Sequence, residues 1–112
     1  SGMTIRITSS AFRYTAPPAH DQLIQLALQE FLSNAHRHGN ATQVNVHLHY
    51  TKEGLTLTMK DNGKGTAHIS KNIGLTGVEE RAQKEGGHVH ITSAPGAGFM
   101  TQIKLPRGES HD

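Results

Sequence analysis

The sequence has 112 residues, of which 34% are apolar and 12 are glycine, so it fits one folded domain and excludes a disordered tail. Its 11 Lys and Arg against 9 Asp and Glu leave a net charge of only +2, which does not indicate a nucleic-acid partner. The absence of Cys excludes disulfides, thiolate catalysis and Cys-based zinc sites, and no run approaches the roughly 18 apolar residues of a membrane span.

The domain is expected to cover residues 3–108. Ser1 and Gly2, directly before Met3, are interpreted as residues left by cloning ahead of a chosen start point, and this opening has neither the basic end nor the apolar run of a signal peptide. We therefore exclude them from the predicted fold.

The first elements along the chain are a strand and a long helix. Residues 5–9 alternate between apolar and polar side chains, which predicts a half-buried strand that ends before Ala16-Pro17-Pro18. Apolar residues then recur at helical spacing from about His20 to His38, and Gly39-Asn40 provides a helix stop.

Two strands and a glycine-rich loop come next. Residues 43–50 and 55–60 each alternate between apolar and polar side chains, and residues 52–54 between them predict a hairpin. The loop Asp61-Asn62-Gly63-Lys64-Gly65 follows directly after the second of these strands.

The last part of the chain predicts a second helix and a second hairpin. The helix runs from about residue 75 to 84 and is ended by Gly86-Gly87. Residues 89–91 and 101–105 read as strands joined by the turn at 95–98.

The predicted order is therefore β, α, β, β, α, β, β. Each predicted strand has one apolar and one polar face, so helices are expected to cover one side of the sheet while the other stays wet. The pattern predicts a two-layer α/β (α+β) sandwich.

One face of the first helix carries a row of polar groups. Glu30 and Asn34 are four residues apart, and Arg37 and His38 follow one turn later. A carboxylate, an amide oxygen and two basic groups in a row suit a phosphate and its magnesium ion. The alternative is the ordinary solvated face of an amphipathic helix.

Two glycine-containing segments are candidates for ligand contacts. In the loop 61–65 the glycines permit a close backbone approach to a ligand, although Asp, Asn and Gly are also common turn formers. Residues 74–77 stand at a helix start, where free backbone N–H groups favour an anion. The polar segment 64–73 between them is consistent with a mobile lid.

In this order and spacing the three segments closely resemble the GHKL ATPase superfamily. Within it, the chain looks like the catalytic ATP-binding domain of a bacterial two-component sensor histidine kinase, of the subgroup that signals to helix-turn-helix response regulators. The matching segments are Gln29–His38 for the N box, Asp61–Gly65 for the first glycine box and Gly74–Ala82 for the second. Gly86-Gly87 and Ser93–Gly98 complete the pattern, so the resemblance covers nearly the whole chain.

The resemblance implies a Bergerat-type fold, a mixed sheet with helices on one face, that binds Mg²⁺ and ATP. It implies an ATP-dependent protein histidine kinase that transfers the γ-phosphoryl group to a histidine on a separate dimerisation domain, for two-component signal transduction. Because phosphoryl transfer depends mainly on positioning, a domain without its acceptor is expected to show little turnover.

The resemblance also implies roles for individual residues. Asn34 would coordinate Mg²⁺, and Glu30 would act as or assist the general base. Asp61 would accept a hydrogen bond from the adenine amino group. Many relatives have Thr directly after the last glycine turn, whereas here Phe99 and Met100 intervene before Thr101, the candidate for that supporting role. The other implied ATP-binding residues are Arg37, His38, Gly63, Gly65, Gly74, Leu75, Thr76 and Gly77.

The implied partners are dimerisation and phosphoacceptor helices outside this sequence and a cognate response regulator, with no nucleic acid. The implied location is cytoplasmic, as the inner part of a membrane-bound sensor. The fragment is expected to be a monomer and the full-length protein a homodimer.

Other interpretations stay open at this point. An anti-sigma-factor-type serine kinase of the same superfamily would use the same boxes, although the run Gly74–Arg81 favours the sensor kinase. The nine histidines include two i,i+2 pairs, at 47/49 and 88/90, which would form a zinc or nickel site if their strands were adjacent. The alternative for these pairs is a wet sheet face that tolerates His.

His20-Asp21 is similar to the His-Asp pair in which the kinase subgroup carries its phosphorylated histidine. Here the pair begins the very helix that holds Glu30 ten residues later. We therefore interpret both as helix-start residues, with Asp21 favoured by the helix dipole.

Overall fold

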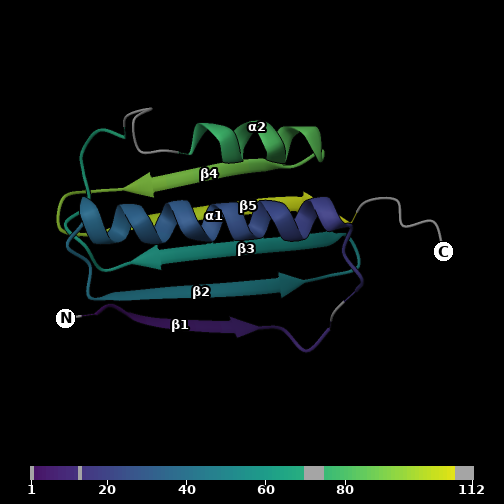
Figure 1. Ribbon diagram of the computed structural model, residues 1–112, viewed down its shortest axis with the longest axis horizontal. Coiled ribbons are helices and arrows are strands. Elements are labelled where there is room, and N and C mark those ends of the chain that lie inside the picture. Colours follow the sequence, from purple (N-terminus) through teal and green to yellow (C-terminus); the bar gives the residue numbers. More distant parts are fainter. Residues whose placement is uncertain (1, 13, 70–74, 108–112) are drawn as a thin grey trace.

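The computed structural model describes residues 2–12, 14–69 and 75–107, which contain five strands and two helices (Figure 1). In chain order the elements are β1 (Thr4–Ser9), α1 (Pro18–Arg37), β2 (Gln43–Tyr50), β3 (Gly54–Asp61), α2 (Thr76–Lys84), β4 (His88–Ser93) and β5 (Phe99–Pro106). This is the order that the sequence predicts.

The five strands form one mixed sheet in the order β1-β2-β3-β5-β4. β1 pairs with β2 in parallel, and the other three pairs are antiparallel. α1 packs against β3 and β5, and α2 lies beside it over β4 and β5 (Figure 1). The prediction of a two-layer α+β sandwich is confirmed.

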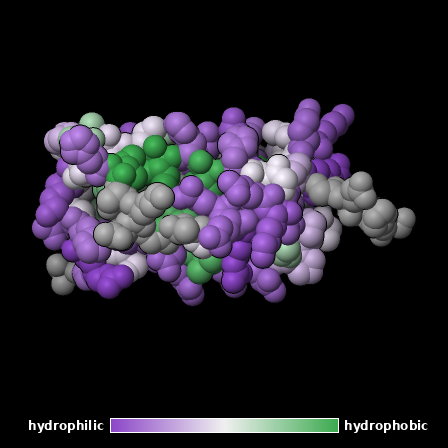
Figure 2. Space-filling model, turned by 90° about the horizontal axis from the view of Figure 1, so that it is seen from above, coloured by the Kyte–Doolittle hydropathy of each residue, from purple (hydrophilic) through white to green (hydrophobic). Residues whose placement is uncertain are grey.

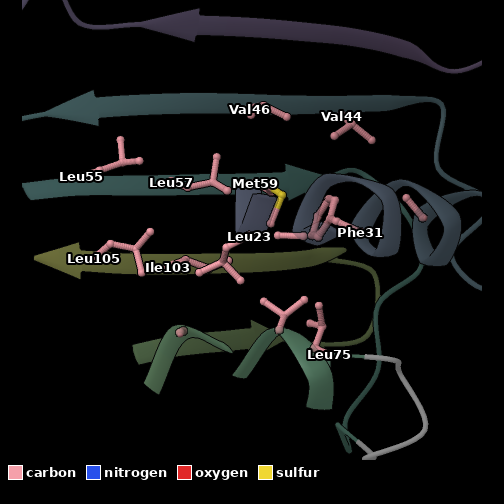
Figure 3. Packing of buried hydrophobic residues seen from close by; sticks show 14 of the residues in the cluster. Leu23, Phe31, Val44, Val46, Leu55, Leu57, Met59, Leu75, Ile103 and Leu105 are labelled. Carbon is pink, nitrogen blue, oxygen red and sulfur yellow. The ribbon is translucent and has the colours of Figure 1, made fainter. Parts of the chain in front are cut away.

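The core lies between the helices and the middle strands (Figure 3). α1 buries one residue per turn along a single stripe, and β2, β3 and β5 bury alternate residues, as expected for a helix and a sheet that share one apolar layer. The side chains of this layer include Leu23, Ala27, Phe31 and Ala35 of α1, Val78 and Ala82 of α2, and Val44, Val46, Leu57, Met59 and Ile103 of the sheet.

α1 begins two residues before the predicted start. Pro18 is its first residue and Pro17 precedes it as the N-cap. The first turn of a helix needs no N–H donor from its first residue, so proline fits there. The two prolines therefore start the helix as well as ending the loop before it.

The prediction that β1 is half-buried is wrong. All six of its residues are exposed, and Ile5 and Ile7 are 44% and 60% exposed. Their partners in the sheet are Val44 and Val46, so both isoleucines lie on the helix-covered side. They remain exposed because β1 is the edge strand and α1 packs over β3 and β5 instead.

Aromatic and cationic groups meet where β2 and β5 end. The Tyr14 ring packs edge-on against Tyr50 at a centroid distance of 5.4 Å, and the Arg107 guanidinium lies 5.1 Å from the Tyr14 centroid. Burial, with a smaller contribution from Tyr50, raises the pKa of the Tyr14 hydroxyl above its ordinary value, and Arg107 partly opposes this.

Neither described helix combines the length and apolar character of a membrane span.

Candidate functional site

The segments singled out in the sequence meet at one end of the molecule. The C-terminal end of α1, the end of β3 and the turn between β4 and β5 lie together, on the left in Figure 1. The Lys64 N–H donates to the Gly39 carbonyl at 2.9 Å, and the Gly96 N–H donates to the Lys64 carbonyl at 2.7 Å. The loop after β3 is thus bonded to the end of α1 on one side and to the β4–β5 turn on the other.

Asp61 holds a buried carboxylate at the end of β3. It is 4% exposed, and its Oδ1 accepts hydrogen bonds from the Gly63 N–H at 2.8 Å and the Phe99 N–H at 3.2 Å. Two backbone donors from different segments fix the orientation of the carboxyl group. A carboxylate held this way can accept a further hydrogen bond from a ligand.

Close backbone contacts explain the glycines around Asp61. Gly98 has φ +69°, and a Cβ there would lie 2.1 Å from the Asp61 carbonyl oxygen. Gly65 has φ +63°, and its Cβ would lie 2.1 Å from the Ala94 carbonyl oxygen. A Cβ at Gly63 would lie 2.6 Å from the Gly39 carbonyl oxygen. Only glycine allows these three chain segments to pack this closely.

Two anchoring side chains have roles that the sequence analysis missed. The Asn62 Oδ1 accepts hydrogen bonds at 2.9 Å from the backbone N–H groups of Thr42 and Gln43, which ties the loop to the start of β2. The Ser93 Oγ donates to the Gly98 carbonyl at 2.6 Å and accepts from the Thr66 N–H at 2.9 Å. Both residues stand inside the matched segments, but the sequence does not give the strand pairing that provides their partners.

Thr101 carries a buried hydroxyl without a partner. It is fully buried on β5 opposite Met59, and its Oγ1 makes no hydrogen bond in the described structure. Strand alternation puts Thr101, Met59 and Asp61 on the same, helix-covered side of β3 and β5. A buried polar atom without a partner is uncommon, and a ligand or a water molecule at this position would satisfy it.

The polar row of α1 reaches the same end of the molecule. Glu30 and Asn34 are half-buried one turn apart, and Arg37 and His38 are exposed. The Asn34 carbonyl accepts the N–H groups of His38 and Gly39, which close the helix just before the contact with Lys64. The row therefore adjoins the loop that follows Asp61.

The second glycine box is described only in part. Gly74 and residues 70–73 of the expected lid lie outside the described residues. Leu75 directly precedes α2 and is 4% exposed, so its side chain belongs to the core and only its backbone can face a ligand. Thr76 is the first residue of α2, and Gly77 is exposed in its first turn with open space around it.

Figure 2 shows a group of apolar side chains at the surface on the left of its view, whereas most of the remaining surface in this view is hydrophilic.

The histidine pairs do not form a metal centre. His47 and His49 lie on β2 and His88 and His90 on β4, but β3 and β5 separate these strands. Three strand spacings of about 4.8 Å are too far for shared ligation of one ion. Among residues 2–12, 14–69 and 75–107 no group of three or more His, Cys, Asp or Glu is placed to hold a metal.

The His20-Asp21 pair lies in the first turn of α1, as expected for helix-start residues. His20 is 1% exposed, and its Nε2 lies 3.5 Å from an oxygen of Glu85, which follows α2. The side chain packs between the two helices, at the opposite end of α1 from Asn34.

Comparison with known proteins finds a family model that matches most of the chain and relatives with similar sequences. A family model for "Histidine kinase-, DNA gyrase B-, and HSP90-like ATPase" matches residues 19–109. The sensor histidine kinase YxjM of Bacillus subtilis (strain 168) is 31% identical over 107 residues, which are 95% of this chain and 26% of that protein. The sensor protein VraS of Staphylococcus haemolyticus is 36% identical over 95 residues, which are 82% of this chain and 27% of that protein.

The fold also matches a solved ATP-binding domain. The ATP-binding domain of PrrB from Mycobacterium tuberculosis superposes with a TM-score of 0.69 at 24% identity, covering 94% of this chain and 82% of that one. The chain spans about a quarter of the length of the two sequence relatives. The names of these relatives favour the sensor-kinase interpretation over the serine-kinase alternative.

Proposed function

Because the chain belongs to the family of histidine kinase-, DNA gyrase B- and HSP90-like ATPases, we propose that residues 3–108 are the catalytic ATP-binding domain of a sensor histidine kinase. In the whole protein this domain delivers the γ-phosphoryl group of ATP to a histidine on a separate dimerisation domain. The similarity to YxjM and VraS, both named as sensors, supports this proposal.

The observation that carries the proposal is that Asp61 and Thr101 are both buried on the helix-covered side of the neighbouring strands β3 and β5. Adenine presents an amino group where guanine presents a carbonyl, so a fixed carboxylate acceptor selects adenine. The Asp61 carboxylate is buried and oriented by two backbone N–H groups, and the unpartnered Thr101 Oγ1 lies on the same side of the sheet. Together they suit the polar edge of an adenine base.

The polar row of α1 and the start of α2 suit the phosphates. Asn34 offers an amide oxygen, a hard ligand that fits Mg²⁺, and Glu30 one turn earlier is placed to act as or assist a general base. Bound ATP supplies the phosphoryl group, and the protein supplies position and charge. The remaining phosphate contacts in this proposal are Arg37, His38 and the backbone N–H groups of Gly74, Leu75, Thr76 and Gly77.

The loop glycines and the partners complete the proposal. Gly63 and Gly65 allow the loop after Asp61 to pack against the backbone of Gly39 and Ala94. In this proposal the loop held in this way closes around the base and ribose. The partners are the helices that carry the acceptor histidine and a cognate response regulator, at the cytoplasmic side of a membrane sensor.

The isolated chain is a monomer, and a stable dimer in sedimentation at micromolar concentration would contradict this.

Calorimetric titration of ATP and GTP, each with and without Mg²⁺, tests the proposal. ATP should bind with Mg²⁺-dependent affinity and GTP should not. The Asp61→Asn variant should bind ATP at least about tenfold more weakly, because a charge-assisted hydrogen bond contributes roughly 1.5–3 kcal/mol. The matched control is Asp21→Asn, an exposed residue in the first turn of α1 that should leave the affinity unchanged.

A folded wild-type chain that binds no adenine nucleotide would refute the nucleotide site. ATP binding that is equal in Asp61→Asn and wild type would refute the role of Asp61 in recognising adenine.

A further inference from the structure

The side of the sheet without helices, here called the open face, carries an unusual charge pattern. Alternate residues of every strand point to it, and most of them are polar and exposed. Its permanent cations are Arg6 on β1, Lys60 on β3 and Lys104 on β5. The two histidine pairs of β2 and β4 lie on the same face.

No Asp or Glu occupies an outward position of the open face on any of the five described strands. The carboxylates of the described residues lie in α1, in or directly after α2, in the β2–β3 turn and, at Asp61, on the helix-covered side. The small net charge of the chain therefore hides a separation of charge between its two layers.

A cavity of about 350 Å³ lies on the open face over β1, β2 and β3. The register places Arg6, Asn45 and Lys60 in one row across these strands, so a side-chain amide lies between two cations. All three residues line the cavity, together with hydroxyl and imidazole groups of the next row, Thr8, His47 and Thr58. The cavity thus gathers hydrogen-bond donors and positive charge.

The imidazole at this cavity is held in place. The Thr8 Oγ1 and the His47 Nδ1 are 2.6 Å apart, and the His47 ring stacks on that of His49 at a centroid distance of 6.2 Å with 22° between the planes. Polar groups that are already oriented lose little conformational entropy when a ligand binds.

We propose that the open face docks a carboxylate-rich segment of a partner protein, with one carboxylate seated between Arg6 and Lys60. Charge complementarity carries this assignment, because the face offers cations, amides, hydroxyls and imidazoles, and its outward positions on the described strands hold no competing carboxylate. The surface lies on the opposite side of the sheet from Asp61, so it is separate from the proposed nucleotide site.

Other polyanions fit this face less well. It presents no Phe, Tyr or Trp at its outward strand positions on which bases could stack, and three permanent cations neutralise few phosphates. Recognition of an anionic membrane typically uses a cluster of about four to eight Lys and Arg. An acidic protein segment needs only a few paired contacts.

The test measures binding of a fluorescent oligoglutamate peptide to the wild-type chain and to two double variants. Arg6→Glu with Lys60→Glu reverses the two cations of the cavity, and it should weaken binding at least about tenfold. Lys52→Glu with Lys84→Glu changes the net charge equally, in the β2–β3 turn and at the end of α2, and it should change the affinity by less than about twofold. Circular dichroism melting confirms that both variants fold.

Backbone amide shifts in a titration of ¹⁵N-labelled wild type should concentrate on β1, β2 and β3. Equal weakening in both double variants, or shifts confined to α1 and α2, would overturn the proposal. Absence of peptide binding to the folded wild type would also overturn it. Tighter binding of duplex DNA or of vesicles rich in phosphatidylserine, lost in the Arg6/Lys60 variant, would reassign the face to that partner and reject the acidic segment.

Discussion

Asp61 and Thr101 are both buried polar residues on neighbouring strands, but their hydrogen bonding differs. The Asp61 carboxylate has two backbone donors, whereas the Thr101 hydroxyl has no partner in the described structure. An unsatisfied buried hydroxyl costs roughly 1–3 kcal/mol of folding free energy, and such a cost is commonly recovered when a ligand binds. Because the Thr101 hydroxyl has no partner in the fold, a substitution that removes it can distinguish a structural role of this group from a role in ligand binding.

The Thr101→Val variant should leave the free energy of unfolding of the ligand-free chain unchanged or raise it by up to about 1 kcal/mol. The same variant should weaken ATP binding several-fold, because the base loses a hydroxyl partner. Urea unfolding and calorimetry on the same samples measure the two effects. A large loss of stability without a change in ATP affinity would show that the hydroxyl serves the fold instead.

Glycine substitutions test the close packing around Asp61. Gly98→Ala combines a positive φ with a Cβ 2.1 Å from the Asp61 carbonyl oxygen, so it should cost about 2 kcal/mol or more and reduce ATP affinity. Gly96→Ala is the matched control, since its φ is +78° but nothing lies within 4 Å of the added Cβ. Its cost should be about 1 kcal/mol, with ATP binding retained. Thermal melts that give equal losses for both variants would contradict the packing argument.

At the scale of single residues, the sequence identifies the groups with distinctive chemistry but not their supports. The glycines around Asp61 mark a backbone that approaches something closely, and the resemblance to a known family suggests the ligand. The anchoring bonds of Asn62 and Ser93 depend on which strands are neighbours, and nothing in the local sequence records that. The burial of Thr101 opposite Met59 depends on strand register in the same way.

Among the elements, β1 shows what an alternation of apolar and polar residues can predict and what it cannot. Its alternation of apolar and polar residues predicts a strand, which is confirmed, and also half-burial, which is wrong. β2 has the same alternation and is buried on its apolar side. The difference is position, because β1 is the sheet edge beyond the reach of α1, and position in a sheet is not encoded in a strand's own residues.

Two substitutions compare an edge strand with a central one. Leu57→Ala on β3 empties a site that is 1% exposed and should lower the free energy of unfolding by about 2–5 kcal/mol. Ile7→Ala on β1 removes a side chain that is 60% exposed and should cost no more than about 1 kcal/mol. Urea unfolding with an unchanged m-value measures both. A comparable loss at Ile7 would mean that this side chain is covered in solution.

For the whole molecule, ligand binding should appear as stability. A ligand that binds only the folded chain adds about 2.7 kcal/mol at a hundredfold excess over its Kd, which corresponds to a rise in Tm of roughly 10 °C for a domain of this size. Mg²⁺ with ATP should produce this shift in a fluorescence melt, EDTA should reduce it, and GTP should not cause it. An unchanged Tm with ATP at high concentration would contradict the nucleotide proposal.

The overall architecture follows from the sequence in part. Periodicity and turn residues give the number, type and order of the elements, because these are local properties of the chain. The parallel pairing of β1 with β2 and the place of β5 between β3 and β4 are non-local, and only the family resemblance anticipates a mixed sheet. The separation of charge between the layers also emerges only once the strands are in register.

The position of β5 in the sheet determines when the sheet can be completed as the chain is synthesised. β5 is the last described strand to leave the ribosome, yet it lies inside the sheet and joins β3 to β4. Until it emerges, the edge of β3 is unpaired and β4 has no neighbour in the sheet, so a nascent chain exposes apolar strand surface. A stalled or truncated chain that ends before Phe99 should therefore depend on chaperones, even though most of the domain has already been translated.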